Sequence, residues 1–472
     1  MSTPSSHPSS RRPDRGLLLA LLLVLLAAAA VVLTSPAQVP APVRRASSTG
    51  DLVRTTAIAC PDLAPVPRAR AGVRVGLAPA EPGLPGGPVE GPTGAQDLER
   101  GALVVVPPAD RDGGPVLRAR GPAAPGLFAT RTDVARGRTL GVTGCPAPRA
   151  EWWFTGAGAG LDHRSTLLLA NVDPGPAVVD LRVLGPDGEV DTVASRGVLV
   201  APHSRKRVAL ADVAPQTDDL ALSVHAERGR VVAALDDSRR TGPTARPGQE
   251  WLAGTEAPSR TLRLAGVPGR ADRLTLLVAN PSGLEAVVDL RVSGSSGTFT
   301  PTGLEPVTVA PGTVRSVDLT RALARTVRPG EPVALRLTSE QPVVASLRST
   351  VGGDETLAPA VVPLTGPAAA SVVPGARATV RLSAGSTAAR VRVTAYGARG
   401  RRVDATTLSL RPATTAGWSP EPGAAYVVVS PARPGTVSGA VGYAGAAGGV
   451  ATVPLTPLPL RQQRPPVRPG LP

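Results

Sequence analysis

The chain has 472 residues, enough for three or four domains of ordinary size, and its hydrophobic fraction of 42% is sufficient for packed cores. Only ten residues are aromatic, so these cores must be built mainly from Val, Leu and Ala. Glycine and proline together make up 105 residues, a share that stays below the roughly 25–30% typical of disordered chains. The composition therefore excludes wholesale disorder and favours short strands joined by many turns.

The net charge of +15 comes almost entirely from arginine, because Lys206 is the only lysine. One explanation is binding to a polyanion such as an anionic lipid or an acidic wall polymer. The other is the codon bias of a GC-rich genome, and arginines that are spread along the chain favour it. The chain has no basic runs interleaved with aromatic residues, which argues against a nucleic-acid partner.

The N-terminus predicts export. Arg11, Arg12 and Arg15 precede an unbroken apolar run over residues 17–33. Positive charge before such a run predicts a cytoplasmic N-terminus and an extracytoplasmic remainder. The run reaches the lower length limit of a membrane span and exceeds the core of a signal peptide. We therefore expect an uncleaved single-pass anchor in the cell membrane, with secretion after cleavage near Ala37 as the alternative.

Cys60 and Cys145 are the only cysteines of the chain. In an exported protein such a pair most often forms a structural disulfide. A redox pair or a metal site is the alternative, but neither cysteine has a CxxC partner or a nearby histidine. We expect the disulfide to close a module over residues 51–150.

A seven-residue segment occurs twice. Residues 177–183 read Ala-Val-Val-Asp-Leu-Arg-Val and return unchanged at residues 286–292. The alternation of apolar and polar residues predicts a strand with one buried face. Residues 166–171 and 275–280 match at the same offset, so the repeat has the size of a domain. Glu250-Trp251 is read as the second copy's version of Glu151-Trp152.

The repeats predict the fold class. Six or seven short strands in about 100 residues, without amphipathic helices, indicate antiparallel sandwiches. We expect a mainly β protein, a row of tandem immunoglobulin-like β-sandwich repeats after a single N-terminal transmembrane helix. The expected division is a cytoplasmic tail (1–16), an anchor or uncleaved signal (17–36), a linker (37–50), the disulfide-closed module (51–150), repeat 1 (151–257), repeat 2 (258–368), a divergent repeat 3 (369–455) and a disordered Pro-rich tail (456–472).

Three tryptophans are the best candidates for a ligand site or for packing at module junctions. Trp152 and Trp153 are adjacent in a predicted strand and should point to opposite faces, so one of them should be at least partly exposed. An exposed indole could stack on a sugar. The alternative is that both pack at the junction of the first two modules, and Trp251 at the next junction supports it.

Asn171 and Asn280 are the only asparagines and occupy the same position in the two copies. Because Asn tolerates left-handed backbone angles and closes Asx-turns, we predict a turn-forming role for both.

No catalytic, cofactor-binding or metal-ligating residues are predicted. The segment Asp162-His163-Arg164-Ser165 contains the letters of a hydrolytic triad, but a triad requires groups that converge from distant segments. Two pairs of adjacent aspartates occur at residues 218–219 and 236–237. We expect both pairs to lie on solvated turns rather than to form glycosidase or calcium sites.

On these residues the chain resembles an uncharacterised family of actinobacterial secreted or membrane-anchored envelope proteins, the domain-of-unknown-function family DUF5719. The resemblance rests on the apolar N-terminal segment, Cys145-Pro146, the run Trp152-Trp153-Phe154-Thr-Gly and the duplicated strands, and it covers roughly residues 50–455. The family has no established activity, so the resemblance implies no catalytic residue.

We therefore expect a non-enzymatic envelope protein that acts as an extracytoplasmic scaffold or binding module. The alternatives are a carbohydrate or wall-polymer binder that uses Trp152 or Trp153, and a wall-active hydrolase. The expected partners are the plasma membrane, through residues 17–33, and an envelope protein or an anionic wall polysaccharide.

Overall fold

The computed structural model describes residues 50–61, 69–106, 114–135, 139–240, 248–446 and 448–461. These residues form a mainly β structure of antiparallel sheets, as the sequence predicts. Among them no helix is long and apolar enough to cross a membrane. The predicted anchor over residues 17–33, its linker and most of the Pro-rich tail lie outside the described residues.

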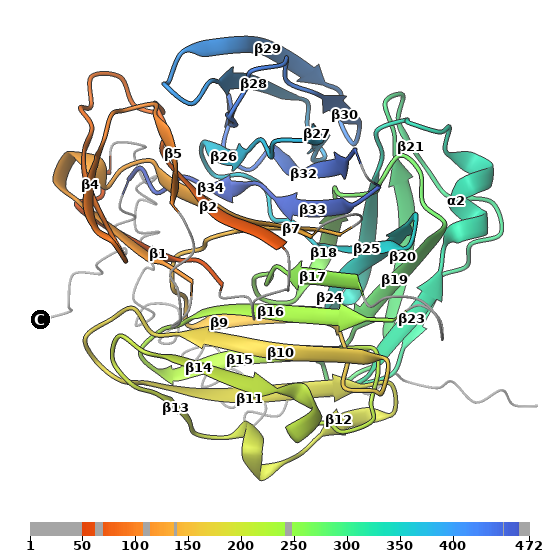
Figure 1. Cartoon of the computed structure of the whole chain (residues 1–472). Helices are drawn as coiled ribbons and strands as arrows, with labels where there is room; N and C mark the ends of the chain where they lie inside the picture. The colour runs from red at the N-terminus through yellow and green to blue at the C-terminus, as the bar shows by residue number, and fades with distance from the viewer. Residues whose placement is uncertain are drawn as a thin grey trace, which may run out of the picture. The chain divides into compact units, whose positions relative to one another are not determined.

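The second module shows the arrangement most clearly (Figure 1). Its strands form two sheets, in the orders β14-β10-β16-β17 and β12-β11-β15-β9, with β13 beside β11. The repeated heptad lies in β11, and alternate residues from Ala177 to Val183 face a core that both sheets share. The elements are β9 (Glu151–Ala157), β10 (His163–Ala170), β11 (Ala177–Gly185), β12 (Gly188–Val190), η2 (Val193–Ser195), β13 (Val198–Val200), β14 (Arg205–Ala209), η3 (Leu210–Asp212), β15 (Leu220–Arg228), β16 (Val232–Arg239) and β17 (Gly248–Leu252).

The third module repeats this order, with one strand, β24, pairing in both of its sheets. Its first strand is β18, which pairs with β24 as β9 pairs with β15. The reading of Glu250-Trp251 as a second copy of Glu151-Trp152 is therefore wrong, because Trp251 lies in β17, the last strand of the second module. The elements are β18 (Ser259–Leu264), β19 (Arg273–Ala279), β20 (Ala286–Ser293), β21 (Thr298–Phe299), β22 (Val307–Val309), β23 (Val314–Asp318), α2 (Thr320–Thr326), β24 (Ala334–Val351) and β25 (Asp354–Pro359).

The fourth module has the same strand order in sheets β29-β28-β31-β26-β34 and β30-β27-β32-β33. Its core again contains alternate residues of both sheets. The strands are β26 (Ala368–Ser371), β27 (Ala376–Ala384), β28 (Ala389–Tyr396), β29 (Arg402–Leu410), β30 (Thr415–Trp418), β31 (Tyr426–Pro431), β32 (Val437–Gly445), β33 (Val450–Pro454) and β34 (Thr456–Pro457).

The first module is also a copy, which the sequence did not indicate. Its sheets β1-β6-β3-β4 and β5-β2-β7-β8 place the eight strands in the same order as β9 to β17 of the second module. The Cys60–Cys145 disulfide joins the start of this module to its end, as predicted. The elements are β1 (Thr55–Ala59), β2 (Ala69–Leu77), β3 (Gly87–Gly91), β4 (Gly94–Leu98), β5 (Leu103–Val106), β6 (Val116–Arg120), η1 (Gly121–Ala123), β7 (Leu127–Ala135) and β8 (Leu140–Gly144).

The four modules form a closed cycle of contacts through their last strands. β8 contacts β17 and β33, and β25 contacts the same two strands. One face of each last strand packs on its own module, and the other face packs against the preceding module. β8 closes the cycle, because Leu140 and Val142 pack into the core of the fourth module. At the end of the described chain, Val53 N donates a hydrogen bond to Leu460 O. The expectation of a row is therefore wrong, because the last module returns to the first.

Candidate functional site at the centre of the four modules

The last strands of the four modules begin close together, around one carboxylate. Asp354 is the first residue of β25, and its Oδ2 accepts hydrogen bonds from Val450 N at 2.9 Å and Leu140 N at 3.3 Å. These donors are the first residues of β33 and β8. A Cβ on Gly248, the first residue of β17, would lie 3.9 Å from Asp354 Oδ1. One side chain thus joins strands of three modules beside a glycine of the remaining one.

Asp354 and Glu250 are buried carboxyl groups with atoms that lack a hydrogen-bond partner among the described residues. Asp354 is 1% exposed, and burial raises its pKa to about 7. Glu250 on β17 accepts a hydrogen bond from Trp251 N at 3.0 Å, whereas its second oxygen has no hydrogen-bond partner in the described part of the chain. Burial, and then the charge of Asp354, raise the pKa of Glu250 well above its usual range. Both environments favour the neutral carboxylic acid.

A second set of acids lies between the first and second modules. Asp133 on β7 forms a buried ion pair with Arg131 at 3.2 Å, and Trp251 Nε1 lies 3.4 Å from Asp133 Oδ2. Burial raises the pKa of Asp133, and Arg131 opposes this effect. Gln249 Nε2 donates to Asp236 Oδ1 at 3.0 Å, and burial raises the pKa of Asp236 to about 6. Trp251 therefore packs at this junction, not at the next one.

His163, Ser165 and Asp237 do meet in space, although Asp237 is far from the others in the sequence. His163 Nε2 lies 3.0 Å from Asp237 Oδ1, and Ser165 Oγ donates to the same oxygen. The other ring nitrogen, Nδ1, lies 3.4 Å from Asp218 Oδ1. Both the serine and the histidine thus contact the aspartate, whereas nucleophilic catalysis needs the base bonded to the nucleophile. His163 and Asp237 are 1% and 3% exposed, so the group is enclosed.

The expectation that the paired aspartates lie on solvated turns is wrong in part. Asp237 is buried on β16 and faces His163. Asp219 ends a turn but forms a 2.9 Å ion pair with the buried Arg348 of the third module. Asp218 keeps an exposed side chain.

Trp152 and Trp153 point to opposite faces of β9, and both are buried, at 2% and 5% exposure. Trp152 lies in the core of the second module and donates from Nε1 to Val231 O at 2.9 Å, with Arg149 over its ring. Trp153 packs against residues of the second and third modules, among them Leu184 and Val314. Neither indole presents a face to solvent, because the outer face of β9 is covered by the next module.

Asn171 and Asn280 make equivalent turns. The Oδ1 of Asn171 accepts from Asp173 N at 3.0 Å, and the Oδ1 of Asn280 accepts from Ser282 N at 3.1 Å. Each Nδ2 also donates to the backbone of the strand that follows, to Val200 O at 3.1 Å and to Val309 O at 3.0 Å. The two amides therefore hold the same turn to the same strand in both copies.

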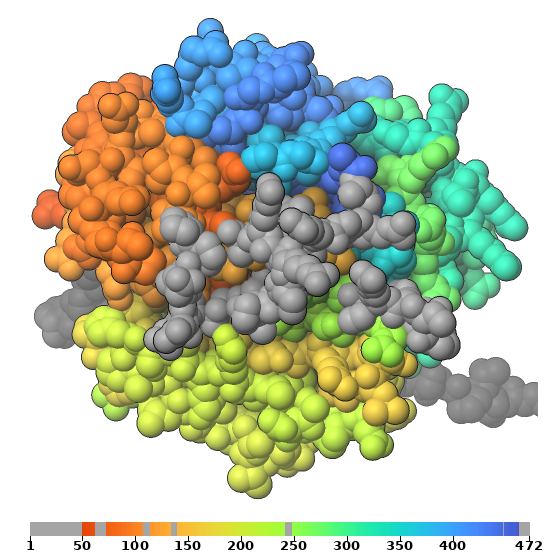
Figure 2. Space-filling view, viewed as in Figure 1, coloured from red at the N-terminus to blue at the C-terminus, as the bar shows by residue number. Residues whose placement is uncertain are grey.

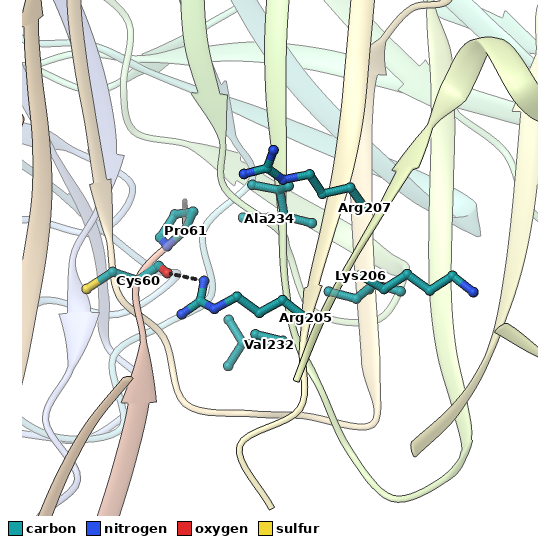
Figure 3. Close-up of a pocket in the computed structure, with 10 residues that line it drawn as sticks. Cys60, Pro61, Arg205, Lys206, Arg207, Val232 and Ala234 are labelled. Atoms are coloured by element: carbon teal, nitrogen blue, oxygen red, sulfur yellow. Dashed lines mark hydrogen bonds between the residues drawn. The ribbon is translucent and has the colours of Figure 1, made fainter. Parts of the chain in front are cut away.

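A cavity with a basic lining lies between the first two modules. Figure 3 shows Arg205 reaching from β14 to the carbonyl of Cys60, whereas Lys206 points away from it. The cavity holds about 20 Å³, and two other cavities in the described part of the chain hold about 10 Å³ each. Such volumes admit about one water molecule, far below the ~300 Å³ of small-molecule sites.

The central arrangement can therefore hold the four modules together. Among the described residues, no group of three or more His, Cys, Asp and Glu side chains is arranged to hold a metal ion. Glu250 and Asp354 were not singled out from the sequence. Each lies in a short strand, and the sequence gives no sign that other modules bury it.

The comparisons with known proteins support a family but no activity. The model of DUF5719, described as a family of unknown function, matches residues 105–421, from the first module into the fourth. Among solved structures, the Streptomyces avermitilis α-L-rhamnosidase complexed with L-rhamnose is 10% identical over 84% of this chain, with a TM-score of 0.12. The chain spans 55% of that protein, and so low a score carries no argument. A comparison of the sequence with curated proteins found no match.

Proposed function

The chain belongs to DUF5719, a family of unknown function, and from that premise we propose that it is a non-enzymatic scaffold of the cell envelope. In this proposal four immunoglobulin-like sandwiches stand outside the cytoplasm, held to the plasma membrane through residues 17–33. The observation that carries it is the closed cycle of β8, β17, β25 and β33, which uses the inner strand of every module for packing. Only the outward faces of the modules are then left for partners.

Two observations support the extracytoplasmic location. The Cys60–Cys145 disulfide is typical of proteins in an oxidising compartment outside the cytoplasm. The positive residues that precede the apolar segment predict the same orientation.

The alternatives are less well supported. A hydrolase would need an accessible nucleophile bonded to a base, and Ser165 donates to Asp237 rather than to His163. A sugar binder of the stacking type would need an exposed indole, and Trp152 and Trp153 are both buried.

Crosslinking of the intact envelope, followed by purification of the full-length protein, tests the proposal. We expect a reproducible set of envelope proteins or polymers, reduced when residues 17–33 are replaced by a cleavable signal peptide that releases the chain. Release of soluble fragments from purified wall by the wild-type protein, abolished in His163→Ala or Ser165→Ala, would instead assign a hydrolase. If the protein is found only in the culture medium and forms no crosslinks to envelope components, the scaffold proposal is wrong.

A further inference from the structure

The net positive charge of the chain is concentrated in its fourth module, because acids are scarce there while arginine is as frequent as elsewhere. Residues 363–461 contain ten arginines, and Asp404 and Glu421 are their only acids, for a net charge of +8. More than half of the net charge of +15 thus lies in about a fifth of the chain. The second module, residues 151–257, has eleven basic and fifteen acidic residues, for a net charge of −4. Codon bias acts on every module alike and does not explain this difference.

Two of these arginines share one open face of a sheet. Val391 and Val393 of β28 are fully buried in the core of the module. Since side chains of a strand alternate, Arg390 and Arg392 project from the opposite face, where both are exposed. Residues two apart in a strand are separated by roughly 6–7 Å, so the two arginine side chains leave the strand next to each other.

The neighbouring strands add hydroxyl groups to this face. Ser409 and Thr407 of β29 lie directly opposite Arg390 and Arg392, and both are exposed. On the other side, Ser430 of β31 lies opposite Arg392. We call Arg390, Arg392, Thr407, Ser409 and Ser430 the arginine face. In Figure 2 the blue atoms of this module lie at the surface.

No acid neutralises the arginine face within the described residues. Neither Arg390 nor Arg392 takes part in an ion pair or a side-chain hydrogen bond there. Asp404 lies opposite Ala395, which is in the core, so its side chain starts on the other face of the sheet. Glu421 lies in the loop that leads into β31 beside Tyr396, at the far end of β28 from Arg390.

The equivalent position in the second and third modules carries the opposite charge. Arg392 lies opposite Ser430 on β31, as Asp180 lies opposite His225 on β15 and Asp289 opposite Thr338 on β24. The register is fixed at the start of the strand, where Ala389 lies opposite Leu410 as Ala177 lies opposite Val200 and Ala286 opposite Val309. One strand position thus carries aspartate in the second and third modules and arginine in the fourth, which has only two acids.

We propose that the arginine face binds an anionic polysaccharide outside the cytoplasm. Guanidinium groups form forked hydrogen bonds with carboxylates, and the serine and threonine hydroxyls can bond to sugar hydroxyls. A lipid surface is less well matched, because no large apolar side chain of residues 363–461 is highly exposed in the described structure. Stacking on nucleobases would need exposed aromatic rings, which this face lacks. This inference rests on the scaffold proposal and names the chemistry of one partner.

Binding of the full-length protein in mild detergent to immobilised polygalacturonate tests the inference, with neutral dextran as the reference polymer. We expect binding to polygalacturonate at low salt, weakened at physiological salt because exposed charges are screened over about 8–10 Å. The double substitution Arg390→Gln and Arg392→Gln should weaken it roughly 2- to 25-fold, since each exposed charge pair contributes about 1.4- to 5-fold.

The matched control removes two exposed arginines from α2 of the third module, Arg321→Gln with Arg325→Gln. It has the same net charge as the first variant, and we expect it to bind within about twofold of the wild type. Equal loss in both variants, or binding only to phosphatidylcholine–phosphatidylglycerol vesicles, would overturn the inference. Crosslinked envelope partners that persist in the Arg390/Arg392 variant would leave the scaffold proposal standing on its own.

Discussion

Replacing Asp354 by asparagine should remove a stability loss that the wild type suffers as the pH rises. The Asn oxygen can still accept from Leu140 N and Val450 N, and its amide stands in for the neutral carboxyl group. Burial raises the pKa of Asp354 from 3.8 to about 7, so between these values the folded state holds a proton that the unfolded state has lost. The stability from this residue is therefore complete below the unfolded pKa and falls until the pH passes the folded pKa.

The size of the effect follows from the shift. Each unit of pH in that window costs about 1.4 kcal/mol, so between pH 5 and pH 8 the wild type should lose roughly 3 kcal/mol through Asp354. With an unfolding entropy of about 2.1 cal/mol/K per residue, that loss lowers the melting temperature of a cooperative unit of ~400 residues by about 3–4 °C. The charge of the neighbouring Glu355 also opposes the ionisation of Asp354.

Thermal unfolding followed by circular dichroism at pH 5 and pH 8 provides the measurement. Asp354→Asn should match the wild type at pH 5 and exceed it at pH 8, and a smaller pH dependence should remain from Glu250 and Asp236, whose pKa values are also raised. The exposed Asp97 supplies the control, because Asp97→Asn should change neither melting temperature. A wild type that is no less stable at pH 8, together with an Asp354→Asn variant that is destabilised at both pH values, would refute the reasoning.

Two further perturbations test the packing. Gly158→Ala places a Cβ 2.1 Å from His163 Nδ1 and should lower the free energy of unfolding, measured in urea, by about 1–3 kcal/mol. In the control, Gly175→Ala, the new Cβ has no atom within 4 Å, so the free energy should change by less than about 0.5 kcal/mol. Equal effects would contradict the enclosed position of His163. Replacing Cys60 and Cys145 together by serine opens a loop with a sequence separation of 85 and should cost about 4 kcal/mol, read from non-reducing calorimetry; a wild type that melts alike with and without reductant would argue that the bond is not formed.

Much of the local structure could be predicted because it depends on neighbouring residues. The alternation in residues 177–183 predicts a strand with one buried face, and β11 has this pattern, with Ala177, Val179 and Val183 in the core. The asparagines and the cysteine pair were also recognisable from residue type and spacing. The copy in the first module was missed, since its strand order is kept without the repeated letters.

What covers the second face of each strand was decided only by the tertiary structure. The position of Trp152 and Trp153 in β9 shows that they face opposite ways. It does not show whether the outer face of β9 is covered by water or by a neighbouring module. The same holds for Asp354 and Glu250, which become buried only because strands of four separate modules meet around them. Alternation is a property of a few consecutive residues, whereas closure depends on contacts between residues hundreds of positions apart. The sequence by itself therefore determined the strands and the repeat, and the packing of the modules determined which of their polar and aromatic side chains remain accessible.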